Sequence, residues 1–129
     1  MDRVTFKRTL RGRTTTVAPG VLDAERSGRG THVASRLVFS DESTFSEEGT
    51  IDFGRGDALR FRSVGAGTLE RAPGGDVRHG ASVLDVAEGA GRYAGARGRI
   101  TSNFVLSPDG EITDEQVVVL FIDRERSRK

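Results

Sequence analysis

The stretch from Glu88 to Gly98 constrains the fold of this chain more than any other, because glycine recurs in it at short intervals. It lies between two strand-like runs, Val77–Ala87 and Arg99–Leu106. A backbone that needs so many positions without a side chain either turns sharply or passes close to another strand. The segment therefore predicts a turn between two neighbouring strands, and it says nothing direct about chemistry.

Turn signals recur about every ten residues along the chain, which is typical of a β-sandwich or β-barrel, and no helical period is sustained. The polar, glycine-rich stretch from Val21 to Gly30 predicts a loop with a short helical turn. The other runs predict eight strands: Val4–Leu10, Thr14–Val17, Thr31–Phe39, Thr44–Phe53, Ala58–Arg71, Val77–Ala87, Arg99–Leu106 and Ile112–Asp123. Eight antiparallel strands commonly close on themselves. The sequence thus predicts an all-β fold, a closed and roughly eight-stranded antiparallel barrel.

Length and composition narrow the class of protein. The 129 residues predict one barrel domain over residues 1–123 and a charged, frayed tail over 124–129. The net charge of +1, from 20 basic and 19 acidic side chains, argues against a nucleic-acid partner. Cysteine is absent, which excludes thiol chemistry. Neither an apolar signal core nor a run of about 20 apolar residues occurs, so we expect a cytoplasmic protein without a membrane partner.

Alternation along the predicted strands assigns their faces. Within Thr44–Phe53, the apolar residues Phe45 and Ile51 share a parity with Glu47, so this face is predicted to line the interior. Small residues recur at the predicted inward positions, namely Gly49, Ser63, Gly65 and Gly67. Small residues on one wall leave room either for a ligand or for a large side chain opposite. The seven phenylalanines are available to fill that room, so both alternatives stay open.

The last predicted strand is apolar on both faces over Val117–Ile122. Its outward face must therefore also be covered. A homo-oligomer interface is the expected cover, and the chain's own loops are the alternative.

One part of the chain resembles a known family. The run from Ser82 to Ile100, followed by Ser102-Asn103-Phe104, is similar to the glycine turn and flanking strands of the bacterial relatives of allene oxide cyclase. Ala90 departs from the threonine that is more usual there. The resemblance implies an eight-stranded, calycin-like barrel, often oligomeric, with an apolar cavity and no cofactor. Members of the family include isomerases and cyclases, but the motif marks the fold, so it transfers no catalytic residue.

Glu47 is the candidate catalytic residue, because its parity places it on the predicted inward face. A carboxyl group in an apolar barrel has a raised pKa and can act as a general acid or base. In the alternative, Glu47 lies in solvent at the barrel mouth, or a bulge shifts the register and reverses the face.

The candidate ligand-binding residues are the uncharged polar, aromatic and histidine side chains predicted to reach the interior: Tyr93, Asn103, Gln116, His79 and Phe61. Tyr93 alternatively plugs the barrel end, and His79 alternatively lies at the surface, as does His32. Asn103 and Gln116 alternatively face outward, where they carry no function. With two histidines far apart and no cysteine, no metal site is expected. Gly89–Ala94 matches the dinucleotide pattern G-x-G-x-x-G/A, but no helix follows it, so no nucleotide cofactor is expected.

These features predict a cofactor-independent cyclase or isomerase that holds an apolar small molecule, polyketide- or fatty-acid-derived, in the barrel. The first alternative is a non-catalytic barrel that binds such a molecule. The second is an interaction protein whose interior is filled by its own side chains.

Overall fold

The computed structural model describes residues 1–123, which form strands joined by tight turns and one short 3₁₀ helix. The expected tail at 124–129 lies outside the described residues. The strands are β1 (Asp2–Ala18), β2 (Val21–Gly28), β3 (Thr31–Phe39), β4 (Thr44–Gly54), β5 (Asp57–Ser63), β6 (Gly67–Arg71), β7 (Arg78–Ala90), β8 (Arg97–Leu106) and β9 (Glu111–Ile122), with the helix η1 (Gly91–Tyr93) between β7 and β8.

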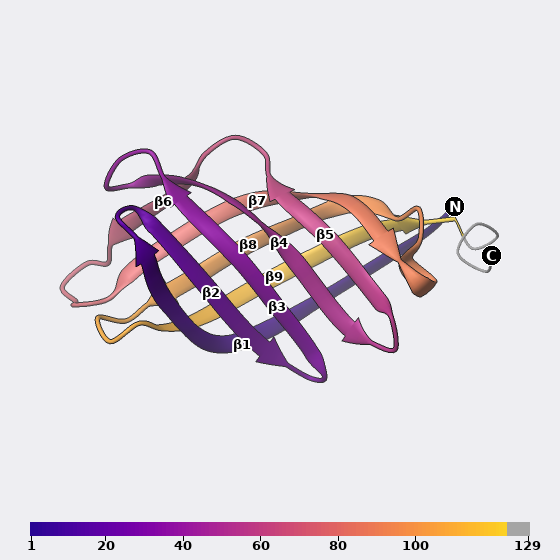
Figure 1. The fold of residues 1–129 in the computed structure, drawn as a ribbon, viewed down its shortest axis with the longest axis horizontal. Helices are drawn as coiled ribbons and strands as arrows, with labels where there is room; N and C mark the ends of the chain where they lie inside the picture. The colour runs from indigo at the N-terminus through magenta and orange to yellow at the C-terminus, as the bar shows by residue number, and fades with distance from the viewer. Residues whose placement is uncertain (124–129) are drawn as a thin grey trace.

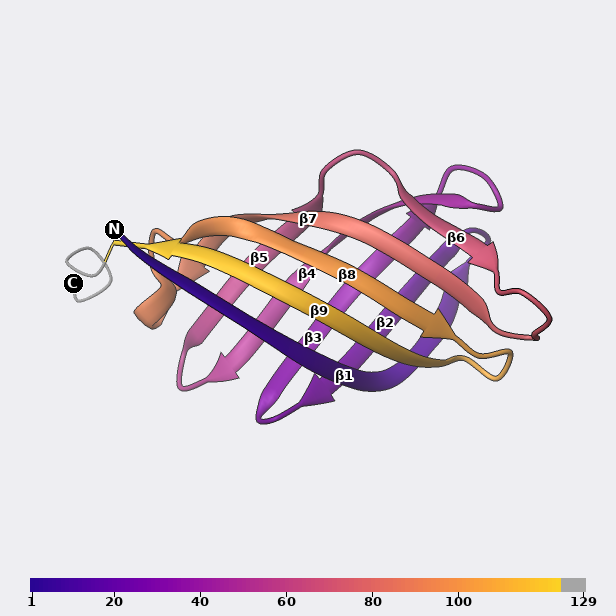
Figure 2. The same ribbon diagram turned by 180° about the vertical axis from the view of Figure 1, so that it is seen from behind.

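The strands close into an antiparallel barrel, as the sequence predicts (Figures 1 and 2). The order is β3-β2-β1-β9-β8-β7-β5-β4, and β3 pairs with β4 to close the ring of eight. The short strand β6 stands outside this ring and pairs with β4 and β7 where β5 has ended. The all-β closed barrel is therefore confirmed.

The sequence predicts two strands where the structure has one, and it predicts a loop where the structure has a strand. These two errors offset each other in the predicted number of strands. Val4–Leu10 and Thr14–Val17 belong to the single strand β1, which pairs with β9 along its first part and with β2 along its last. The turn expected between them is absent, because Gly12 keeps the backbone extended while it passes directly over the backbone of Glu25, where a Cβ atom would overlap. The loop expected over Val21 to Gly30 is instead mostly β2.

The strand predicted over Ala58–Arg71 is interrupted. It divides into β5 and β6, and the chain bends outward between them at Gly65, which has a φ of 71°. At the break, the backbone amide of Glu47 donates to the Ser63 hydroxyl at 2.9 Å. A side-chain hydrogen bond therefore joins β4 to the end of β5 at this break.

Phenylalanine rings occupy the room that small wall residues leave inside the barrel. A Cβ atom added to Gly67 would lie 2.5 Å from the ring of Phe45, and one added to Gly80 would overlap the ring of Phe104. In both cases the ring comes from the directly paired residue of the neighbouring strand, so a large side chain of the same wall, and not one opposite, fills the room.

The apolar interior consists of two separate clusters. The Tyr93 cluster contains Leu10, Val33, Ile51, Leu59, Phe61, Leu84, Val86, Tyr93, Ala96, Ile100, Val118, Leu120 and Ile122. The Phe45 cluster contains Ala24, Leu37, Phe45, Leu69, Phe104, Leu106 and Ile112, with Leu22 and Phe39 packed against it. The turns β1–β2, β3–β4, β6–β7 and β8–β9 gather at one end of the barrel, opposite the two termini (Figure 1).

Candidate functional site

A layer of buried polar side chains separates the two apolar clusters. Along β3, Ser35 lies between Val33 and Leu37, which belong to different clusters, and the same holds for the polar positions of β4, β8 and β9. Six strands contribute to this polar layer, which consists of Arg26, Ser35, Glu47, Ser82, Ser102, Asp114 and Gln116. Charged groups in an interior must be paired and hydrogen-bonded to be tolerated.

Arg26 is the centre of the polar layer. Its Nη1 lies 2.7 Å from Oδ2 of Asp114, and its Nη2 lies 3.5 Å from Oε2 of Glu47. The same Nη2 donates to the hydroxyl of Ser35, which in turn donates to Oε2 of Glu47 at 2.7 Å. One guanidinium group is therefore shared between two carboxyl groups from different strands.

Further hydrogen bonds complete the coordination of the carboxylates. Ser82 donates to Oε1 of Glu47 at 3.3 Å, and Ser102 donates to Oδ1 of Asp114 at 2.7 Å. Gln116 donates to Oδ2 of Asp114 at 3.0 Å. The amide oxygen of Gln116 accepts from Nε and Nη2 of Arg8 at 3.0 and 2.8 Å. Within the described residues, two buried nitrogens have no acceptor, Nη1 of Arg8 and Nε of Arg26.

Burial sets the electrostatics of this layer. It raises the pKa of Glu47, while the charge of Arg26 and the hydrogen bond from Ser35 oppose the shift. Burial also lowers the pKa of Arg8 to about 10. The inward position of Glu47 is confirmed, and its pKa shifts in the expected direction. The apolar cavity expected around it is absent, because its carboxylate is packed among hydroxyl groups and a guanidinium group.

The other predicted site residues divide between the interior and the surface. Gln116 is buried and joined to the polar layer, and Phe61 is buried in the Tyr93 cluster. Tyr93 is buried at the barrel end, with its ring 4.7 Å from that of Phe53, which matches its alternative as a plug. Asn103 and His79 are exposed.

The expectation that His79 and Asn103 reach the interior is wrong. On β7 the inward residues are Gly80, Ser82 and Leu84, so His79 shares the outward parity of Val83. Asn103 lies between two buried residues of β8 and points away from the barrel. His32 is exposed as well, and in residues 1–123 no three histidine or acidic side chains gather as a metal site would require.

Sequence reasoning missed Arg26 and Asp114, although parity could have found both. Asp114 alternates in step with the apolar residues Ile112 and Val118. Arg26 alternates in step with Leu22 and Ala24, but the stretch was interpreted as a loop, to which no face is assigned.

The end of the barrel away from the termini is hollowed. This barrel-mouth hollow has a volume of about 940 Å³. Its apolar floor is formed by Leu22, Phe39 and Leu69. Charged residues of both signs also line it: Asp41, Glu42, Glu70, Arg71 and Arg78. A second hollow, of about 570 Å³, crosses the outer wall over β2 to β5 and β7. Glu47 lines neither of them.

Comparisons with protein-family models, curated proteins and solved structures find no match for this chain. The resemblance to the allene oxide cyclase relatives therefore stays a prediction. No helix within residues 1–123 has the length and apolar character needed to cross a membrane.

Proposed function

We propose that this protein is a small-molecule-binding barrel whose open end takes an apolar molecule. The observation that carries the proposal is the barrel-mouth hollow, in which Leu22, Phe39 and Leu69 form an apolar floor beneath open space. Its volume of about 940 Å³ lies in the range of small-molecule sites. Leu69 belongs to the Phe45 cluster, and Leu22 and Phe39 pack against it, so the floor rests on a packed core.

Catalysis as a cyclase or isomerase is the second candidate function. It is favoured by the burial of Glu47 and by the raised pKa of its carboxyl group. It requires a substrate beside that carboxyl group, where Arg26, Ser35 and Ser82 now lie. The binding function needs no such rearrangement, so the geometry supports it better.

Nile red, a neutral apolar dye, tests the binding function directly. We expect its fluorescence to rise on titration with the protein, and Phe39→Asp to weaken binding at least about tenfold, because a charge then stands in the apolar floor. Val38→Asp is the matched control, since Val38 is the neighbouring residue and is exposed on the outer wall. Leu22→Asp serves as a second floor variant if Phe39→Asp does not fold. Equal binding by the floor and control variants contradicts the proposal.

We also propose that the protein forms a homo-oligomer through the outer face of β9. Val117 and Phe121 are exposed on this face and Val119 is half-buried, whereas Val118 is fully buried inside the barrel. An apolar strip on an outer wall is a feature that soluble monomers tend to avoid. We therefore expect Val119→Asp to dissociate the oligomer in multi-angle light scattering, and Val38→Asp to leave it intact. A monomeric wild-type protein at micromolar concentration contradicts this proposal.

A further inference from the structure

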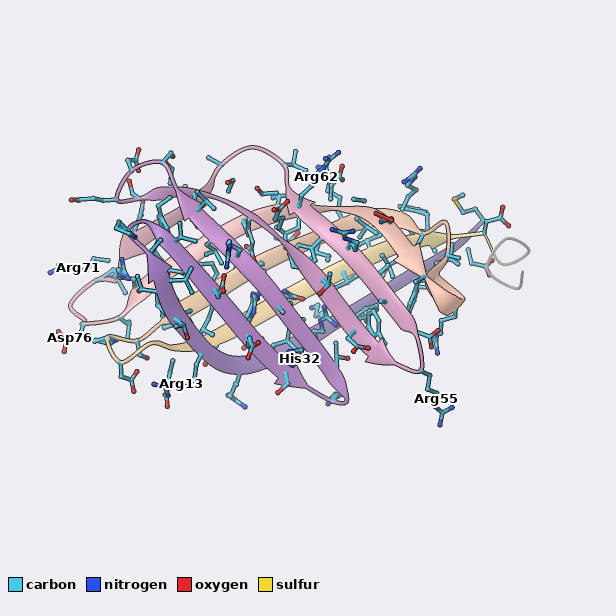
Figure 3. All side chains as sticks on the ribbon, in the orientation of Figure 1. Arg13, His32, Arg55, Arg62, Arg71 and Asp76 are labelled. Carbon is cyan, nitrogen blue, oxygen red and sulfur yellow. The ribbon has the colours of Figure 1, made fainter. Side chains whose placement is uncertain are left out.

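Two arginines stand face to face at the rim of the barrel mouth. Arg71 ends β6 and Arg78 begins β7, and the two are directly opposite in the β6–β7 register. Arg71 shares the inward parity of Leu69, and Arg78 shares that of Gly80. Both line the barrel-mouth hollow, and Arg71 lies at the end of the molecule away from the termini (Figure 3).

Neither arginine forms an ion pair within residues 1–123, unlike arginines of the outer wall. There, each of three arginines pairs with an acid directly across the strands, as Arg36–Asp23, Arg60–Glu88 and Arg99–Asp85. At the rim the residue opposite each arginine is the other arginine. Like charges opposite one another destabilise a strand pair, so an anion between them would be favoured.

Three acidic residues, Asp41, Glu42 and Glu70, also line the barrel-mouth hollow, but none of them forms an ion pair with Arg71 or Arg78 within residues 1–123. Asp41 accepts the backbone amides of Ser43 and Thr44, each at 2.8 Å. Glu70 has the outward parity and lies opposite His79. Glu42 is exposed in the β3–β4 turn, and Asp76, in the β6–β7 turn, lines a neighbouring hollow together with Arg78. None of these four carboxylates is within ion-pair distance of Arg71 or Arg78 in the described chain.

We propose that the ligand of the barrel mouth is an amphipathic anion. Its carboxylate or phosphate group is held between Arg71 and Arg78, and its apolar body packs on Leu22, Phe39 and Leu69. Guanidinium groups bind such planar or tetrahedral oxyanions through paired hydrogen bonds. This inference rests on the proposed binding function and adds the chemical class of the ligand.

Displacement of Nile red by three compounds with the same ten-carbon chain tests the proposal: decanoate, decyl phosphate and neutral 1-decanol. We expect both anions to bind more tightly than 1-decanol, and the stronger of the two identifies the headgroup. In Arg71→Gln/Arg78→Gln, affinity for the anions should fall about tenfold or more, while affinity for 1-decanol and Nile red is unchanged. Arg55→Gln is the control, because this exposed arginine lies in the β4–β5 turn at a distance from the rim (Figure 3).

The outcomes separate the two proposals. Anion affinity that survives the double substitution overturns the arginine site and leaves the binding function standing. Equal losses for decanoate and 1-decanol also overturn it, since charge would then play no part. Failure of every compound, and of Nile red, to bind the wild-type protein overturns the binding function itself.

Discussion

The two halves of the barrel interior differ in how they end. The Tyr93 cluster is closed by η1, which packs Tyr93 against Phe53 and leaves Ala96 fully buried. Within residues 1–123 the Phe45 cluster has no such plug, and Leu22 and Phe39, which pack against it, are only partly buried beneath the hollow. Buried apolar area stabilises a fold, whereas an open apolar floor is available to a ligand. Under the proposed binding function, stability and binding are assigned to opposite ends of one small barrel, with the polar layer between them.

Replacing Arg26 should have the largest effect, because the polar layer joins the two halves. Arg26→Met leaves the carboxylates of Glu47 and Asp114 buried without their shared cation. We expect a loss of about 3–5 kcal/mol in the free energy of unfolding, measured by urea denaturation. The control is Arg36→Met, whose exposed pair with Asp23 should contribute little. Similar losses in both variants would show that the buried charges are not what holds this layer.

Truncating one leucine in each half compares the two clusters directly. Leu84→Ala in the Tyr93 cluster removes a fully buried side chain and should cost about 2–5 kcal/mol. Leu22→Ala should cost less, since its site already faces the hollow and water can enter the space. Denaturation in the presence and in the absence of Nile red sharpens the comparison. Only Leu22→Ala should reduce the amount by which the dye stabilises the protein. A larger loss of stability for Leu22→Ala than for Leu84→Ala would contradict the assignment of stability to the half that contains the Tyr93 cluster.

The smallest expected effect is a change in pH dependence at Glu47. The pKa of this group is raised in the folded protein above its ordinary value of 4.5. Its contribution to stability is therefore full below that value and is lost as pH rises through the folded pKa. The stability of Glu47→Gln relative to wild type should increase with pH over that window. Urea denaturation of both proteins at several pH values measures this difference in stability. A difference that does not change with pH would show that the pKa of Glu47 is not raised.

Alternation places side chains correctly where the apolar residues of a predicted strand are the buried ones. Glu47 is placed in this way, because it follows the parity of Phe45 and Ile51, which are buried. Parity leaves the face of Gln116 open, because the strand that follows it is apolar on both faces over Val117–Ile122. His79 was misplaced, since Ala81 and Val83 are apolar and yet face outward.

Other features are missed because their strand is not recognised, or because they depend on contacts between distant parts of the chain. The strand β2 was missed because its polar residues resemble those of a loop, and with it Arg26, whose burial depends on Asp114 far along the chain. The barrel-mouth hollow was not predictable either, because glycine leaves room that only the position of a ring such as Phe45 decides.

The ion pair between Arg26 and Asp114 has a consequence for how the chain folds. β2 and β9 are not hydrogen-bonded neighbours, since β1 lies between them, and the two residues are 88 positions apart. Early hairpins such as β2–β3 therefore leave Arg26 without Asp114, and a half-closed sheet would hold an unmatched charge against apolar side chains. Such intermediates are penalised, so the barrel should assemble in one cooperative step, and slowly, as expected for topologies dominated by distant pairings.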